Sequence, residues 1–106
     1  MEVCIAYMRE QAVMLSIKDN IIFIDDEAQP IKGISQKDLQ DFSDTVNAIP
    51  YSPGPGYQAL VNAKRTAFLI KLLGHAVGEE CMDKLSHILD SVHFDVLEFL
   101  GENPDN

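Results

Sequence analysis

The chain has 106 residues, which is enough for one hydrophobic core and too few for two. Its 46% hydrophobic and 24% charged residues are typical of a globular protein and exclude a disordered chain. The formal charge of -9 gives an average field that repels nucleic-acid phosphates and anionic lipid. We therefore expect one globular domain over residues 1–106 that binds neither nucleic acid nor a membrane surface directly.

The N-terminus and the apolar runs predict a cytoplasmic protein. The longest uncharged apolar run, 67–70, ends at Lys71, far short of the roughly 20 residues that span a bilayer. The first residues lack the basic, apolar and small-residue regions of a signal peptide. Cys4 and Cys81 have neither the spacing nor the number of a metal site, so we expect free buried thiols. We expect no metal and no cofactor.

The first third of the sequence predicts strands. Apolar residues alternate over 3–8 and 13–17, with 9–11 as a turn between them. A third apolar run, 21–24, follows Asp19 and Asn20, which tolerate the positive φ of a tight turn. Both faces of these strands are apolar, so we expect helices on one face and a partner or second subunit on the other. The segment 30–34 is either a short edge strand or a connection.

Three helices are predicted in the remainder. Ser35 and Asp38 form an Asp variant of the capping box, and Pro50 ends the first helix. The second helix is expected from Pro55 or Gly56 to Leu73. The third is expected from near Glu79 to about 100–101, with a frayed tail at 102–106. The fold class is α+β: an N-terminal three-stranded antiparallel meander (1–34) packed against three C-terminal helices (35–101).

The middle helix is basic in an acidic protein. No acidic residue lies between Asp44 and Glu79, while Lys64, Arg65 and Lys71 give this segment a charge of +3 and leave -12 on the rest. One interpretation is an anion site at the 54–57 turn, which would bind a phosphate or nucleotide. Its ligand-binding residues would be Gly56, Tyr57, Lys64, Lys71 and His75. The favoured interpretation is a stiff hinge, because two prolines remove N–H donors, with the cations neutralising neighbouring carboxylates.

No catalytic centre is predicted. The cluster Asp25, Asp26 and Glu27 suits a hard cation, but a solvated turn that blunts a sheet edge explains it better. Asp83 and His87 are spaced as helical neighbours, which favours a supporting pair over two ligands of an incomplete metal site. Because no Ser-His-Asp or Cys-His constellation can be argued, we expect a protein that is not an enzyme.

Carboxylates on two helices are the predicted partner-binding residues. On the third helix, Phe94 points away from the apolar face and lies among acidic residues, as an aromatic anchor with a charged rim does. The predicted set is Asp38, Asp41, Asp44, Asp83, Asp90, Phe94 and Glu98.

The resulting hypothesis is a small acidic, non-catalytic protein-binding module. It would be of inhibitor, immunity or counter-defence type and would engage a basic surface of a partner protein. Two alternatives stay open. One is the phosphate or nucleotide binder described above, and the other is a homo-oligomeric adaptor or assembly subunit, possibly a homodimer, whose strands pair between copies.

Overall fold

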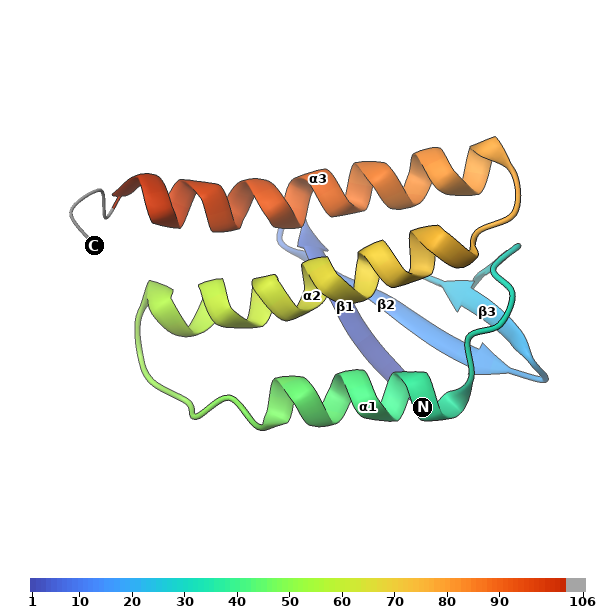
Figure 1. Cartoon of the computed structure of the whole chain (residues 1–106), viewed down its shortest axis with the longest axis horizontal. Coiled ribbons are helices and arrows are strands. Elements are labelled where there is room, and N and C mark those ends of the chain that lie inside the picture. The colour runs from blue at the N-terminus through green and yellow to red at the C-terminus, as the bar shows by residue number, and fades with distance from the viewer. Residues whose placement is uncertain (103–106) are drawn as a thin grey trace.

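The computed structural model describes residues 1–102, with the side chains at positions 95, 98–100 and 102 excepted. Within these residues a four-stranded antiparallel sheet of order β1-β2-β3-β4 is followed by three helices (Figure 1). The elements are β1 (Glu2–Met8), β2 (Gln11–Lys18), β3 (Ile21–Ile24), β4 (Glu27–Gln29), α1 (Gln36–Asn47), α2 (Pro55–His75) and α3 (Glu79–Glu102). The predicted α+β class, with an N-terminal antiparallel sheet packed against C-terminal helices, is confirmed.

Tight two-residue turns connect consecutive strands. Both residues of each turn have positive φ: Arg9 and Glu10 (53° and 66°), Asp19 and Asn20 (54° and 64°), Asp25 and Asp26 (48° and 69°). This conformation matches the twist of the flanking strands. Asp25 adds two bonds to β2, because its amide donates to the Met14 carbonyl and its carboxylate accepts from the Met14 amide, both at 2.9 Å. Gln11, expected in the first turn, is instead the first residue of β2.

The fourth strand, β4, was not predicted. Its three residues pair with β3, with Glu27 opposite Ile24. The predicted acidic cluster is therefore divided, since Asp25 and Asp26 form a turn and Glu27 begins a strand. Residues 30–34 are a connection that makes one antiparallel bridge, between Ile31 and Ala76. A three-residue polar strand is too short for its alternation to be recognised.

One face of the sheet forms the hydrophobic core. The buried side chains of the strands are Val3, Ile5, Ala6, Val13, Leu15, Ile17, Ile22 and Ile24. The helices cover this face side by side, with α2 between α1 and α3 (Figure 1). Leu69 and Leu72 of α2 and Leu85 of α3 are fully buried in the same cluster. On the opposite face Met14 and Phe23 are half-buried, and the expectation that a partner covers them stays a prediction.

A capping box and an ion pair fix the start of α1. The Ser35 hydroxyl accepts from the Asp38 amide, and the Asp38 carboxylate accepts from the Ser35 amide at 2.8 Å, so the predicted capping box is confirmed. The same carboxylate accepts from Lys71 Nζ of α2 at 2.7 Å. The hydrogen bond from Lys71, followed by that from the Ser35 backbone, lowers the pKa of Asp38 to about 2.

An aromatic stack joins α1 to α2. The rings of Phe42 and Phe68 lie 4.3 Å apart between centroids and are inclined by 11°. Leu39 and Phe42 are the buried side chains of α1, so the packing of this helix depends on these two residues.

The ends of α2 and α3 differ from the prediction. α2 continues past Leu73 to His75, and α3 reaches Glu102, which therefore does not belong to a frayed tail. Residues 103–106 of the predicted tail lie outside the described residues. Both cysteines are free thiols as predicted, but only Cys81 is buried, whereas Cys4 is half-buried. No helix in the described part of the chain has the length and apolar character to cross a membrane.

Replacing Asp38 by Asn removes the charge that pairs with Lys71. We expect the free energy of unfolding at pH 7 to fall by about 1 kcal/mol, the usual size of an N-cap contribution. The pKa of the folded carboxylate is below that of the unfolded chain, so its stabilisation is complete above about pH 4 and is lost as the pH falls toward 2. Urea unfolding of both proteins at pH 7 and pH 3 should therefore give a smaller difference at pH 3.

Asp44→Asn is the matched control, because this exposed carboxylate on the same helix accepts only from the Gln40 side chain at 2.8 Å among the described residues. An equal loss in the control, or the same difference at both pH values, would contradict the assignment.

Truncating Phe42 to Ala should destabilise the protein strongly. The variant removes the ring stacked on Phe68 and leaves a cavity, which costs about 3–5 kcal/mol for a buried Phe. Tyr51→Ala is the control, because this exposed ring makes an edge contact with Tyr57 but lies outside the core. Thermal unfolding of the two variants should differ by many degrees, and similar midpoints would show that α1 is not held by the stack.

Candidate functional site

The predicted acidic residues do not form one surface. Asp38 is engaged by Lys71 and the capping box. The exposed Asp41 and Asp44 lie on α1, whereas the exposed Asp83 and Asp90 lie on α3, on the other side of α2 (Figure 1). The predicted set is thus divided between two flanks of the helical layer.

Phe94 is exposed on α3, as predicted, with 61% of its surface accessible. Leu97, one turn further on, is also exposed. Glu98, the remaining predicted contact, has its side chain outside the described residues. The role of this surface in partner binding stays a prediction.

The predicted anion-binding residues are dispersed along α2. Lys71 pairs with Asp38, while Tyr57 packs edge-on against Tyr51 with a centroid distance of 5.2 Å. Lys64 and Gly56 are exposed, more than a helical turn apart. The structure gathers no ligand-binding cluster from this set.

His75, the last member of that set, has a structural contact at the C-terminal end of α2. Its Nδ1 lies 2.7 Å from the Lys32 carbonyl oxygen in the connection after β4. Gly33 lies directly against the ring and has a φ of 81°, and a Cβ at this position would meet Nδ1 at 3.0 Å. A side chain at this position would be strained and would crowd the His75 ring, which favours glycine here.

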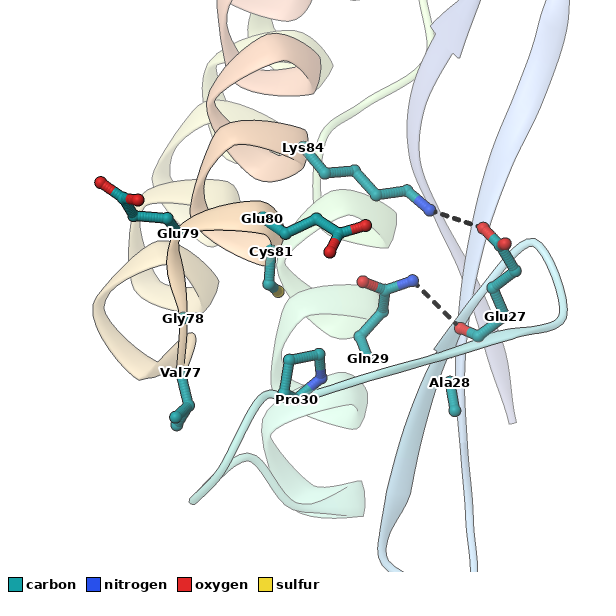
Figure 2. A pocket seen from close by; sticks show the side chains of 10 residues that line it. All are labelled: Glu27, Ala28, Gln29, Pro30, Val77, Gly78, Glu79, Glu80, Cys81 and Lys84. Carbon is teal, nitrogen blue, oxygen red and sulfur yellow. Dashed lines mark hydrogen bonds and ion pairs between the residues drawn. The ribbon is translucent and has the colours of Figure 1, made fainter.

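A groove lies between β4 and the start of α3. Its volume is about 690 Å³ (Figure 2). Two segments far apart in the sequence line it: Glu27, Ala28, Gln29 and Pro30, and then Val77, Gly78, Glu79, Glu80, Cys81 and Lys84. We call it the β4–α3 groove.

Contacts at both ends hold the two walls of the β4–α3 groove in place. At one end the Val77 amide donates to the Pro30 carbonyl at 2.7 Å, beside the bridge between Ile31 and Ala76. At the other end Lys84 Nζ donates to Glu27 Oε2 at 2.9 Å (Figure 2). The sheet ends at β4, so one edge of this strand has no neighbouring strand among the described elements.

A side-chain contact lies within β4. Gln29 Nε2 donates to the Glu27 carbonyl at 3.3 Å, as the second dashed line in Figure 2 shows. Glu27 pairs with Ile24 directly across the two-residue turn, so its backbone groups face β3, and the free edge of the strand presents the backbone N–H and C=O of Ala28.

The β4–α3 groove carries an excess of negative charge. Three carboxylates line it, and Lys84 is the cation among its lining residues. The hydrogen bond from Lys84, and secondly its charge, lowers the pKa of Glu27, so this carboxylate is ionised at neutral pH. Glu80 reaches across the groove toward Gln29, whereas Glu79 points away from it (Figure 2). Both lie in the first turn of α3, where the helix dipole favours carboxylates.

Cys81 lies at the base of the groove. Burial raises the pKa of its thiol, and the charge of Lys84 opposes this only partly. The side chain therefore stays in the protonated, unreactive form at neutral pH.

The sequence analysis did not identify the groove. Glu27 was assigned to a turn, and Glu79 and Glu80 only to the start of a helix. The sequence does show an acidic pair after Gly78 and a polar segment at 27–30. Nothing in the sequence indicates that the two lie side by side, because their proximity depends on the Ile31–Ala76 bridge. Pairing over such a separation is not encoded in local periodicity.

Among the described residues, no group of three or more His, Cys, Asp or Glu side chains is arranged to hold a metal ion. Comparisons of the chain with protein-family models, with curated proteins and with solved structures found no match in any of the three.

Proposed function

We propose that the protein is a small, non-catalytic binding module that takes an extended basic segment of a partner protein into the β4–α3 groove. The observation that carries this proposal is the carboxylate of Glu80, which reaches across the groove toward a free strand edge, beside the ion pair of Glu27 and Lys84. The overall charge of -9 steers a basic partner toward the chain before contact.

The binding mode follows from the two walls of the groove. An extended segment lying against β4 would add a strand to the sheet, so its affinity would come from main-chain hydrogen bonds. Lys or Arg side chains of that segment would pair with Glu80 and Glu27, which supplies the specificity. The backbone N–H and C=O of Ala28, which face the free edge, would bond the incoming strand.

The proposed partners are proteins whose basic surface otherwise holds nucleic-acid phosphates. A segment of such a surface carries the positive charges that the groove would bind, and its occupation would exclude nucleic acid. This supports an inhibitor type of function, in which the carboxylates of the groove compete with phosphates.

A second candidate function is self-association through α2. The side of this helix that faces away from the core carries residues that are exposed, uncharged and mostly small: Gly56, Leu60, Ala63, Ala67, Ile70 and Gly74. Leu60 and Ile70 remain 55% and 56% exposed. Contiguous exposed apolar surface of this kind often marks an interaction site. The charges favour a second copy as the cover, because the exposed Lys64 could meet carboxylates on α1 or α3 of the other copy.

The groove is tested with short peptides that alternate Lys and Val, compared with peptides that alternate Glu and Val. We expect the basic peptide to bind, to bind more weakly as salt is raised, and to shift the NMR signals of β4 and the first turn of α3. Glu80→Gln should weaken its binding about fivefold to tenfold, as measured by fluorescence polarisation, because one charge-assisted bond is lost.

Asp83→Asn and Asp44→Asn are the matched controls, since each removes one exposed carboxylate outside the groove. If either control weakens the peptide as much as Glu80→Gln does, diffuse negative charge explains the binding and the groove is not the site.

Self-association is tested by sedimentation of the protein at high micromolar concentration. We expect a dimer that the double variant Ala63→Glu and Ala67→Glu converts to a monomer, because it places charge in the middle of the apolar face. Met14→Glu, on the opposite side of the sheet, should leave the dimer intact. A monomeric wild-type protein, or a dimer that only Met14→Glu dissociates, would rule out α2 as the interface.

A further inference from the structure

Arg65 is a charged residue on the buried side of α2. It is only 8% exposed, and it lies one helical turn from Val61 and from Leu69, which are both buried. Among the described residues, Arg65 is the one charged or polar residue that is buried. Its guanidinium group places a positive charge on the buried side of the helix.

The described partners of Arg65 do not neutralise this charge. Nη1 donates to the Asn62 amide oxygen at 2.9 Å, and Nη2 lies 3.7 Å from Cys4 Sγ, which is a weak acceptor. The guanidinium carbon lies 5.3 Å from the centroid of the Tyr7 ring. Nε is buried and has no hydrogen-bond partner among the described residues, and neither described ion pair includes Arg65. Buried charges and buried N–H groups are normally paired.

A small pocket of about 190 Å³ lies between β1 and α1 beside this guanidinium. Arg65 and Cys4 line it, together with Ser43 and Asn47 of α1 and Glu2 of β1. Nη2 and Nε share one edge of the guanidinium plane, and Nη2 points toward Cys4 Sγ. Nε is itself buried, so a ligand in the pocket reaches this edge of the guanidinium only when the Cys4 side chain moves aside.

The other polar groups of the pocket include donors. Asn47 Nδ2 donates to Ser43 Oγ at 3.5 Å. Because the Ser43 oxygen is the acceptor in this bond, its own hydroxyl hydrogen can be donated to a ligand. On the β1 side, a β-bulge between Cys4 and Ala6 interrupts the strand, and the Cys4 thiol donates to the Ala6 carbonyl at 3.2 Å. Bulges often redirect side chains next to binding sites. Glu2 is the one carboxylate of the lining and is exposed at its rim.

We propose that this pocket binds a small oxyanion, a carboxylate or a phosphate, on the Nε–Nη2 edge of Arg65. Two oxygens of the anion accept from this edge side by side, which is the geometry that guanidinium groups favour. The anion takes the place of the weak sulfur contact at Nη2, and the Ser43 hydroxyl supplies a further donor. A volume of 190 Å³ is below the range of pockets for drug-sized molecules, so the ligand is smaller than a nucleotide.

The site is separate from the β4–α3 groove, because the two linings share no residue. It also differs from the anion site that the sequence analysis considered, since none of Gly56, Tyr57, Lys64, Lys71 and His75 lines it.

The test is a titration with sodium phosphate and, separately, sodium acetate, against sodium chloride at constant ionic strength. The readouts are the ¹H–¹⁵N signal of Arg65 Nε and the midpoint of thermal unfolding. We expect a saturable shift of the Nε signal with phosphate, acetate or both, and a saturable rise of the midpoint over chloride. The better of the two anions identifies the chemistry of the ligand.

Variants separate this site from general ion effects. Arg65→Met should abolish the anion-dependent rise, and Arg65→Lys should weaken binding about tenfold because it keeps the charge but loses the paired donors. Glu2→Gln should tighten binding, since it removes the carboxylate at the rim. Lys64→Met is the control, because it removes an exposed cation of the same helix and should leave binding unchanged.

Three results would overturn the proposal. The first is an Nε signal that neither anion shifts in the wild-type protein. The second is an equal response of wild-type protein and Arg65→Met. The third is a Glu2→Gln variant with lower stability and no gain in anion binding, which would show that Glu2 is the internal counter-ion of Arg65. If Arg65→Met does not fold, the wild-type and Glu2→Gln titrations still decide the question.

Discussion

Burial of one apolar sheet face beneath α2 is the constraint on which the rest of the molecule depends. Ile5 and Leu15 from the sheet and Leu69 and Leu72 from α2 are fully buried in one cluster. Burying each such side chain contributes about 1.5–3 kcal/mol, far more than an exposed ion pair. Because α2 lies in the middle of the helical layer, α1 and α3 pack on either side of it and complete the cover of the sheet (Figure 1).

The two described ion pairs lie at the margins of this arrangement. Lys71 of α2 reaches Asp38 at the start of α1, and Lys84 of α3 reaches Glu27 on β4. Each joins elements that the core already brings together, so their main effect is to fix local geometry.

Much of the fold could be predicted from the sequence because its signals are local. Alternation gave the first three strands, and Ser35 with Asp38 gave the start of α1. The fourth strand was missed because Glu27, Ala28 and Gln29 show neither an apolar alternation nor high β-propensity. The groove was missed for a different reason, since its walls are brought together only by tertiary pairing at Ile31 and Ala76.

Arg65 shows how composition can mislead when the charge of a segment is counted without its periodicity. Together with Lys64 and Lys71 it gives the segment between Asp44 and Glu79 its charge of +3. Its position between Val61 and Leu69 places it on the buried side, whereas Lys64 is exposed.

The simple order of the sheet bears on how the chain acquires its structure. Each strand pairs with its neighbour in the chain through a two-residue turn, so every step of the ladder closes a short loop. Hairpins of this kind form within about microseconds. The packing of α3 on β1 is the step that joins opposite ends of the sequence. The speed of folding should therefore be limited by the time the last helix needs to find the first strand.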